Sequence, residues 1–199
     1  MTKPIILASM SEIRQNMLQN AGVNFTVRPA RVDEHAIRAA LVQEQARARD
    51  IADTLAEYKA RKIAEKSPQS IVIGSDQILE CDGQLLEKPS SQTDAKEQLR
   101  NLSGKTHHLF SAAVVYDDGA PVWRQVRTVR MTMRTLSPGY IDAYVGRNWP
   151  GIGACVGCYQ IEAEGVRLFS RIEGDYFSVL GMPLTDLLSF LTQKGILEG

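Results

Sequence analysis

The chain has 199 residues, of which 44% are hydrophobic and 23% are charged, a balance typical of a soluble globular protein. This length is enough for one sizeable domain or two small lobes. Lysine plus arginine and aspartate plus glutamate number 23 each, so the formal net charge is zero. That neutrality argues against a nucleic acid polymer or an anionic membrane surface as the partner.

No stretch of the sequence approaches the apolar length that spans a bilayer. Residues 1–8 are predicted to contain a first strand, because their apolar run is too short for a secretory signal. The three cysteines are too few, and too odd in number, for a disulfide framework. We therefore expect a cytoplasmic protein. The single C-x-x-C, Cys155 to Cys158, favours structural cysteines over a zinc or redox site.

The first half of the chain is predicted to alternate strands with helices. The predicted elements are a strand over 5–8, a helix over 12–21, an extended segment over 25–32, one or two helices over 33–66, and strands over 71–80 and 84–87. Ser11 is expected to cap the first helix. Asp82-Gly83 between two β-like runs is a strong hairpin signal.

Hairpins dominate the second half of the predicted pattern. Its elements are a helix over 91–102, strands over 108–116 and 122–133, a helix over 137–145, an irregular stretch over 151–165, strands over 167–172 and 176–180, and a helix over 183–193. The whole pattern predicts an α/β or α+β domain with a mixed sheet.

An acid interrupts the apolar strand that begins at Ile71. Asp76 follows Gly74 and Ser75 directly, and placing a charge inside a sheet costs stability. A functional role for Asp76 is therefore the more specific hypothesis. A two-residue turn at 82–83 would pair Gln77 with Lys88, on the face opposite Asp76. A bulge would instead move Lys88 onto the face of Asp76. A structural ion pair and a functional site are both open at this point.

Two further groups of residues also have a functional and a structural interpretation. Ser9 and Arg14 flank a strand-to-helix junction, which suits phosphate but is also compatible with a capped helix and a solvated arginine. Lys59 lies near one helical face with apolar neighbours, so it could point inward, although such lysines usually extend to solvent. Asp33 and Glu34 follow an extended run and could cap a helix or contact a metal or a sugar hydroxyl.

Several separated motifs together resemble the Maf family of nucleoside triphosphate pyrophosphatases nearly from end to end. They are residues 6–14, similar to the family's L-A-S-x-S-P-x-R but with Glu12 at the proline, and residues 32–34, 59–60, 73–77, 87–89, 102–107, 172–175 and 180–184. The resemblance implies one Maf-like domain over 1–199. It also implies an α/β fold like that of inosine triphosphate pyrophosphatases, with a mixed twisted sheet in two lobes and a central cleft.

The resemblance further implies a house-cleaning enzyme that hydrolyses a nucleoside triphosphate to the monophosphate and pyrophosphate. Asp76 is the implied general base. The implied phosphate ligands are Ser9, Arg14, Lys59 and Lys88, and Glu34 is implied to contact the nucleotide or a metal. The cofactor would be a divalent cation, Mg²⁺ or Mn²⁺, with Asp76 or Glu34 as possible ligands. A homodimer is plausible by the same resemblance.

Three positions bear on the choice of substrate. Where members similar to dTTP/UTP pyrophosphatases have Arg, Thr and Gln, this chain has Ile13, Gln77 and Glu162. Gln77 and Glu162 resemble the subgroup that acts on 7-methyl-GTP, because a carboxylate suits the donors and positive charge of that base. The alternatives are a dTTP/UTP pyrophosphatase and a non-enzymatic nucleotide-binding regulator of cell division.

Overall fold

The computed structural model describes residues 3–198 and gives them a mixed α/β fold, as predicted. The strands are β1 (Ile5–Leu7), β2 (Thr26–Val27), β3 (Ile71–Cys81), β4 (Gln84–Leu86), β5 (Thr106–Asp117), β6 (Ala120–Met133) and β7 (Phe169–Glu173). The helices are α1 (Glu12–Asn20), α2 (Glu34–Gln43), α3 (Ala48–Ala64), α4 (Gln92–Leu102), α5 (Pro138–Asn148), α6 (Tyr176–Leu180) and α7 (Leu184–Gln193). Three short 3-10 turns are η1 (Gly151–Ala154), η2 (Val156–Cys158) and η3 (Glu164–Leu168). They lie in the stretch predicted to be irregular, except that η3 continues past residue 165, so β7 begins two residues later than the strand predicted from residue 167.

One mixed sheet joins all the strands in the order β2-β1-β3-β5-β6-β7, with β4 paired to β3. β1 runs parallel to β2 and β3, whereas β4 pairs with β3 and β7 pairs with β6 in the antiparallel sense. The last pair between β1 and β3 joins Leu7 to Ile73, so β3 continues well past the carboxyl end of β1. Carboxyl ends of parallel strands are the usual place for a ligand in α/β folds.

The chain divides into two compact units. The first unit consists of Met1–Gln77, Phe110–Arg127 and Asp175–Gly199, and the second consists of Ile78–Leu109 and Thr128–Gly174. The cleft implied by the family resemblance stays a prediction.

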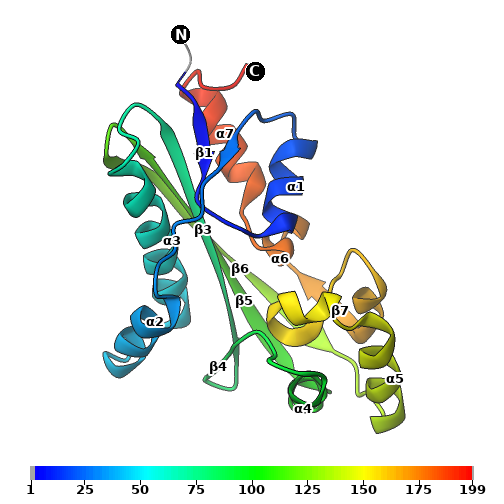
Figure 1. The fold of residues 1–199 in the computed structure, drawn as a ribbon. Coiled ribbons are helices and arrows are strands. Elements are labelled where there is room, and N and C mark those ends of the chain that lie inside the picture. Colours follow the sequence, from blue (N-terminus) through cyan, green and yellow to red (C-terminus); the bar gives the residue numbers. More distant parts are fainter. Residues whose placement is uncertain (1–2, 199) are drawn as a thin grey trace. The chain divides into compact units, whose positions relative to one another are not determined.

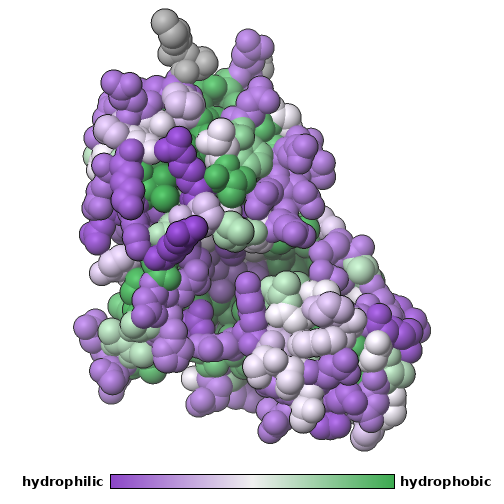
Figure 2. All heavy atoms as spheres, in the orientation of Figure 1, coloured by the Kyte–Doolittle hydropathy of each residue, from purple (hydrophilic) through white to green (hydrophobic). Residues whose placement is uncertain are grey.

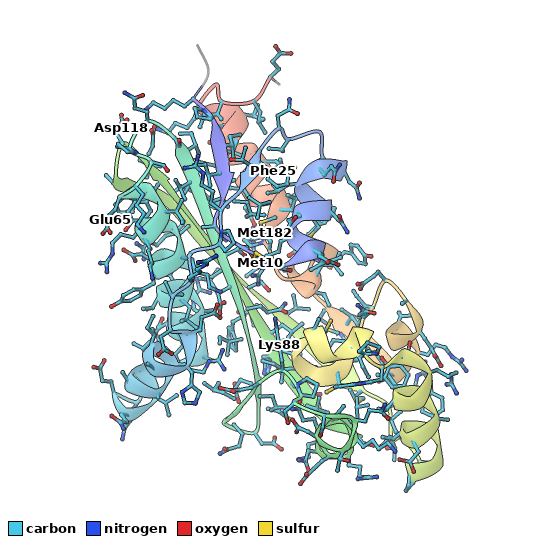
Figure 3. All side chains as sticks on the ribbon, in the orientation of Figure 1. Met10, Phe25, Glu65, Lys88, Asp118 and Met182 are labelled. Carbon is cyan, nitrogen blue, oxygen red and sulfur yellow. The ribbon has the colours of Figure 1, made fainter. Side chains whose placement is uncertain are left out.

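Two helical layers cover the sheet of the first unit (Figure 1). α2 and α3 lie on one side of the strands, and α1, α6 and α7 lie on the other. Alternate residues of β3 face alternate layers, because side chains along a strand point to opposite faces. Ile71 and Ile73 join a buried cluster with Leu18 of α1 and Leu187 of α7. Met182, labelled in Figure 3, is fully buried in the same cluster.

The second unit contains a tight hairpin and a helical pair. Asp82 and Gly83 have φ angles of 51° and 78°, the left-handed values that a two-residue type I′ turn requires. Cys81 pairs with Gln84 across this turn, so the predicted hairpin forms without a bulge beside the turn. α4 packs against α5 and against the turn η2.

The segment 176–180 differs from the prediction: it forms helix α6 and not a strand. The Asp175 side chain accepts a hydrogen bond of 2.9 Å from the backbone N–H of Ser178 and so caps the first turn. Gly181 ends the helix with a φ of 111°, in the left-handed region that favours glycine. These two end signals outweigh the β propensity of the residues between them.

The surface is largely polar where it can be seen. Figure 2 shows hydrophilic side chains over much of the visible face, with hydrophobic residues between them. Within residues 3–198, none of the helices has both the length and the apolar character needed to cross a membrane.

Candidate functional site

A buried ion pair joins α3 to β3 in the first unit. Lys59 Nζ lies 2.6 Å from Asp76 Oδ1, and the two side chains are only 9% and 7% exposed. The same Nζ lies 3.0 Å from Glu34 Oε1 at the start of α2, where the carboxylate is half-exposed. Lys59 therefore points inward and is shared by two acids, which excludes the solvent-directed interpretation of this lysine.

Gly74 allows α3 to come close enough for this pair to form. A Cβ atom at Gly74 would lie 2.1 Å from the backbone oxygen of Ala56 and 2.7 Å from the backbone nitrogen of Ala60. Real side chains do not tolerate such distances, so α3 can pack at this depth only against glycine. Lys59 sits between these two α3 residues, and Asp76 follows Gly74 on the same face of β3.

One oxygen of Asp76 has no hydrogen-bond partner within residues 3–198. Its Oδ2 is buried and accepts no hydrogen bond from the described residues. A carboxylate oxygen of this kind can accept a proton from water or coordinate a hard cation. The described residues contain no group of three acidic, histidine or cysteine side chains placed so that they could together hold a metal ion. Mg²⁺ often binds one or two carboxylates plus water and substrate phosphates, so Asp76 and Glu34 fit that cation.

Arg14 lies buried on the other layer of the first unit, against main-chain oxygens. Its Nε donates to the Gly181 carbonyl at 2.9 Å, and its Nη1 donates to the Ser75 carbonyl at 3.0 Å. Burial lowers the pKa of Arg14, and the negative charges of Asp76 and Glu34 oppose that effect. The alternative of a solvated arginine is therefore wrong, while a contact with phosphate stays a prediction.

Ser9 is buried at the end of β1, and its hydroxyl organises the junction with α1. The Oγ atom accepts a hydrogen bond of 3.2 Å from the Ser11 backbone N–H and lies 3.5 Å from Arg14 Nη1. Ser11 occupies the N-cap position, but its side chain makes no capping bond. The capping role predicted for the Ser11 side chain is wrong, because that hydroxyl does not bond to the helix N-terminus.

The side chain of Gln77 is half-buried and points toward α6. Its Nε2 lies 2.9 Å from Ser111 Oγ and 3.0 Å from each of the carbonyl oxygens of Ser178 and Val179. Ile13, the second predicted specificity residue of the first unit, is half-buried on α1. Whether either residue selects the base stays a prediction.

The second unit holds Lys88 and Glu162, the remaining predicted residues. Lys88, labelled in Figure 3, is exposed in the loop after β4, which ends at Leu86. Both charges act on one thiol: burial raises the pKa of Cys155, the Glu162 carboxylate raises it further, and Lys88 lowers it. Lys88 and Glu162 are thus brought to the surroundings of the same cysteine.

The neighbouring acid Glu164 already has a structural role. It accepts hydrogen bonds of 2.6 Å from Arg147 and 2.9 Å from Asn148, and these contacts lower the pKa of Glu164 to about 2. Of these two acids, Glu162 is therefore the better candidate for a ligand contact.

The sequence prediction missed a set of small residues behind the site, namely Ser75, Ser111, Ser178 and Gly181. Ser111 Oγ donates to the Ser178 carbonyl at 2.6 Å, and Ser75 Oγ donates to the Gly181 carbonyl at 3.1 Å. A hydroxyl within the apolar run of β5 was the available signal for Ser111. The partners of these residues are too distant in sequence for spacing to reveal them.

These features define a class of α/β protein in which a paired acid and lysine lie beyond the carboxyl end of a parallel strand. The chain belongs to the Maf family, since the sequence model of the family described as "Maf-like protein" matches residues 4–194. The family prediction is thereby confirmed.

Relatives of known name cover the chain from end to end. A nucleoside triphosphate pyrophosphatase of Ruegeria pomeroyi is 54% identical over 198 residues, covering 100% of both chains. One of Roseobacter denitrificans is 56% identical over 195 residues, covering 98% of each. A 7-methyl-GTP pyrophosphatase of Brucella abortus is 42% identical over 199 residues, again covering 100% of both.

Among solved structures, a nucleoside-triphosphatase (dITP/XTP pyrophosphatase) of Mycobacterium abscessus matches with a TM-score of 0.37 and 14% identity. The match covers 65% of this chain and 72% of that chain, and a score this low supports no argument.

Proposed function

We propose that this Maf protein hydrolyses a nucleoside triphosphate to the monophosphate and pyrophosphate, with 7-methyl-GTP as its preferred substrate. The pyrophosphatase activity itself is supported by the family, since relatives that cover the chain nearly from end to end are named nucleoside triphosphate pyrophosphatases. The chain is thus an enzyme, a hydrolase acting on acid anhydrides. The single structural observation behind the proposal is the buried Asp76, which pairs with Lys59 through one oxygen and has no hydrogen-bond partner for the other among the described residues.

In the proposed reaction, water attacks the α-phosphorus and the bond to the bridging oxygen of pyrophosphate breaks. Asp76 Oδ2 accepts the proton of the attacking water, while Lys59 keeps the carboxylate fixed through Oδ1. The charges of Lys59 and Arg14 offset the negative charge of the triphosphate. A divalent cation, Mg²⁺ or Mn²⁺ held by Asp76 or Glu34, would neutralise further phosphate charge.

The remaining assignments follow from the family resemblance. Ser9 and Lys88 are proposed to bind phosphates, and Glu34 is proposed to contact the nucleotide or the metal. Glu162 is proposed to accept hydrogen bonds from the donor edge of guanine and to favour the positive charge of its 7-methyl form. The Brucella abortus relative, named a 7-methyl-GTP pyrophosphatase, supports this preference. A cytoplasmic location and a homodimer stay predictions.

The test is pyrophosphate release from 7-methyl-GTP, GTP, dTTP and UTP, each with Mg²⁺ or Mn²⁺ and with EDTA. We expect release that needs the metal and is fastest for 7-methyl-GTP. Preference for dTTP or UTP would overturn the substrate and keep the enzyme. Binding without release from any nucleotide, at any metal concentration, would favour the non-enzymatic regulator.

A further inference from the structure

We propose that Lys62 is a positioning residue for Glu34. Its ammonium holds the backbone of residues 31–33, the segment that leads into α2, and so sets where the Glu34 carboxylate meets Lys59. The inference deepens the proposed function, in which Glu34 contacts the nucleotide or the metal, and it rests on that function for its kinetic consequence. Its structural part uses contacts within the first unit alone.

Hydrophobic packing gives α2 little anchorage. None of the ten described residues of α2 is buried, and its aliphatic side chains Ile37 and Leu41 are half-buried. α2 lies beside α3 (Figure 1), yet residues of both helices, among them Ile37 and Tyr58, line an open cavity of about 340 Å³. An element with so few buried apolar contacts belongs to the least stable part of a fold. The position of Glu34, the first residue of α2, therefore depends on polar contacts.

Two lysines of α3 supply such contacts. Lys59 and Lys62 are three residues apart, so their side chains are neighbours on the helix surface. Lys59 Nζ lies 3.0 Å from Glu34 Oε1, and Lys62 Nζ donates a hydrogen bond of 2.7 Å to the Arg31 carbonyl. A charged donor makes a stronger hydrogen bond than a neutral one. One helix thus holds the segment 31–34 at both of its ends.

The backbone at Arg31 explains why the second contact matters. Its φ angle is 48°, in the left-handed region that costs free energy in a residue other than glycine. Such a conformation persists where the surroundings fix it, and Lys62 bonds to the carbonyl of this residue. Two residues later the Asp33 carboxylate accepts a hydrogen bond of 3.0 Å from the Ala36 N–H and caps α2. The turn at Arg31 therefore determines where α2 begins.

Loss of the Lys62 donor should act on binding and not on proton transfer. Arg31 would relax toward a common backbone conformation, the start of α2 would shift, and Glu34 would no longer be held at Lys59. Lys59 would keep its contact with Asp76, because these two side chains are buried and lie 2.6 Å apart. We therefore expect KM to rise while kcat stays nearly constant.

The experiment compares Lys62→Met, which keeps an unbranched side chain and removes the charged donor, with the parent enzyme. KM and kcat are measured for 7-methyl-GTP at saturating Mg²⁺, and hydrogen exchange of the Ala36 and Ile37 amides is followed by NMR. We expect KM to rise at least about threefold, kcat to stay within about twofold, and both amides to exchange at least about threefold faster. The matched control is Lys66→Met, at an exposed lysine in the turn after α3, which should change none of these quantities.

A second variant tests the role of the left-handed backbone. Arg31→Gly, added to Lys62→Met, should bring KM and both exchange rates back to within about twofold of the parent, because glycine adopts this conformation without strain. Arg31→Gly alone should leave KM unchanged. Failure of the double variant to recover would overturn the role of Lys62 in holding Arg31.

Unchanged amide exchange in Lys62→Met would overturn the inference. An unchanged KM would also overturn it, even with a lower kcat, because a general loss of folded enzyme lowers kcat alone. If the parent protein releases no pyrophosphate from any nucleotide, the proposed function fails. Hydrogen exchange, and its recovery in the double variant, would then still decide whether Lys62 holds the start of α2.

Discussion

Lys59 Nζ lies 2.6 Å from Asp76 Oδ1, and its second acid, Glu34, lies at 3.0 Å. One buried ammonium thus bridges two helices and a strand. The pair fixes the orientation of Asp76 and leaves Oδ2 unpartnered among the described residues. Three of the predicted site residues are therefore brought together by the fold of the first unit alone.

Asp76→Asn should abolish turnover while the protein stays folded. Asparagine has the same shape and still accepts from Lys59, but it cannot take a proton from water, so we expect a loss of at least about 100-fold in kcat. Pyrophosphate release measures the loss, and thermal unfolding checks the fold. Asp50→Asn on the exposed start of α3 is the control. An active Asp76→Asn enzyme would remove Asp76 from the role of base.

Lys59→Met should destabilise the fold. Removing one partner of a buried pair leaves an uncompensated charge, which typically costs about 3 kcal/mol in the free energy of unfolding. Urea unfolding at pH 7 measures this change. The double variant Lys59→Met with Asp76→Asn should recover part of the loss, because the unpaired charge at Asp76 is gone. Additive effects of the two changes would show that the pair is not coupled.

Glu162→Gln should reduce the preference for 7-methyl-GTP. We expect the ratio of kcat/KM for 7-methyl-GTP over UTP to fall by about tenfold, which corresponds to about 1.4 kcal/mol in transition-state binding. Glu164→Gln is the matched control: it should weaken the contacts with Arg147 and Asn148 without changing the ratio. An unchanged ratio in Glu162→Gln would favour the dTTP/UTP alternative.

Gly74→Ala should lower both stability and activity. The added methyl group would collide with the α3 backbone at Ala56, which forces the helix that carries Lys59 away from β3. Overpacking of this kind costs typically about 1–3 kcal/mol. Thermal unfolding and pyrophosphate release measure the two effects. Gly146→Ala in α5, where a Cβ meets no atom within 4 Å, should instead be neutral or stabilising.

His107 should make the fold sensitive to acid. It is fully buried, its Nε2 lies 2.8 Å from the Tyr159 hydroxyl and its Nδ1 has no described partner, and burial lowers the pKa of His107 from 6.5 to about 4. As the pH falls, His107 of the unfolded chain therefore binds a proton at a higher pH than His107 of the folded chain does. The stability contribution is present above pH 6.5 and is lost as the pH falls toward and through about 4.

The matching test is urea unfolding of the parent and His107→Gln at pH 7 and pH 4.5. We expect the parent to lose more free energy of unfolding over this interval than the variant, by up to about 3 kcal/mol. The exposed His35→Gln should behave like the parent. Equal pH dependence of parent and His107→Gln would contradict the prediction.

Much of the fold could be predicted from local signals. Hydrophobic periodicity and end residues located the first helix and the hairpin at Asp82-Gly83, because these elements depend on neighbours in the sequence. The one or two helices predicted over 33–66 are two, α2 and α3. Helix α6 could not be found in this way, since its short run of tyrosine, phenylalanine and valine also suits a strand. The sequence signal for this helix is an N-cap aspartate, Asp175, three residues before Ser178, together with Gly181 at the carboxyl end.

The site was predictable in its residues and less so in its contacts. Asp76 within β3 was recognisable because burying a charge costs free energy of folding, and the ion pair with Lys59 offsets that cost. The partners of Arg14 could not be foreseen, because Gly181 is 167 residues away in the chain. The same holds for Gln77, whose acceptors on α6 come from a segment that was expected to be a strand.

The two compact units have a consequence for how the gene can change. The first unit is assembled from three separate stretches of the chain and the second from two, and β3, β5 and β6 each contribute residues to both. A deletion that removes α7 takes part of the first unit, and one that removes the N-terminal strand does the same. Because neither unit is one continuous stretch of the chain, a single deletion or recombination point in the gene cannot remove or exchange one unit and leave the other intact. We therefore expect this protein to evolve by substitution and loop insertion and not by exchange of units.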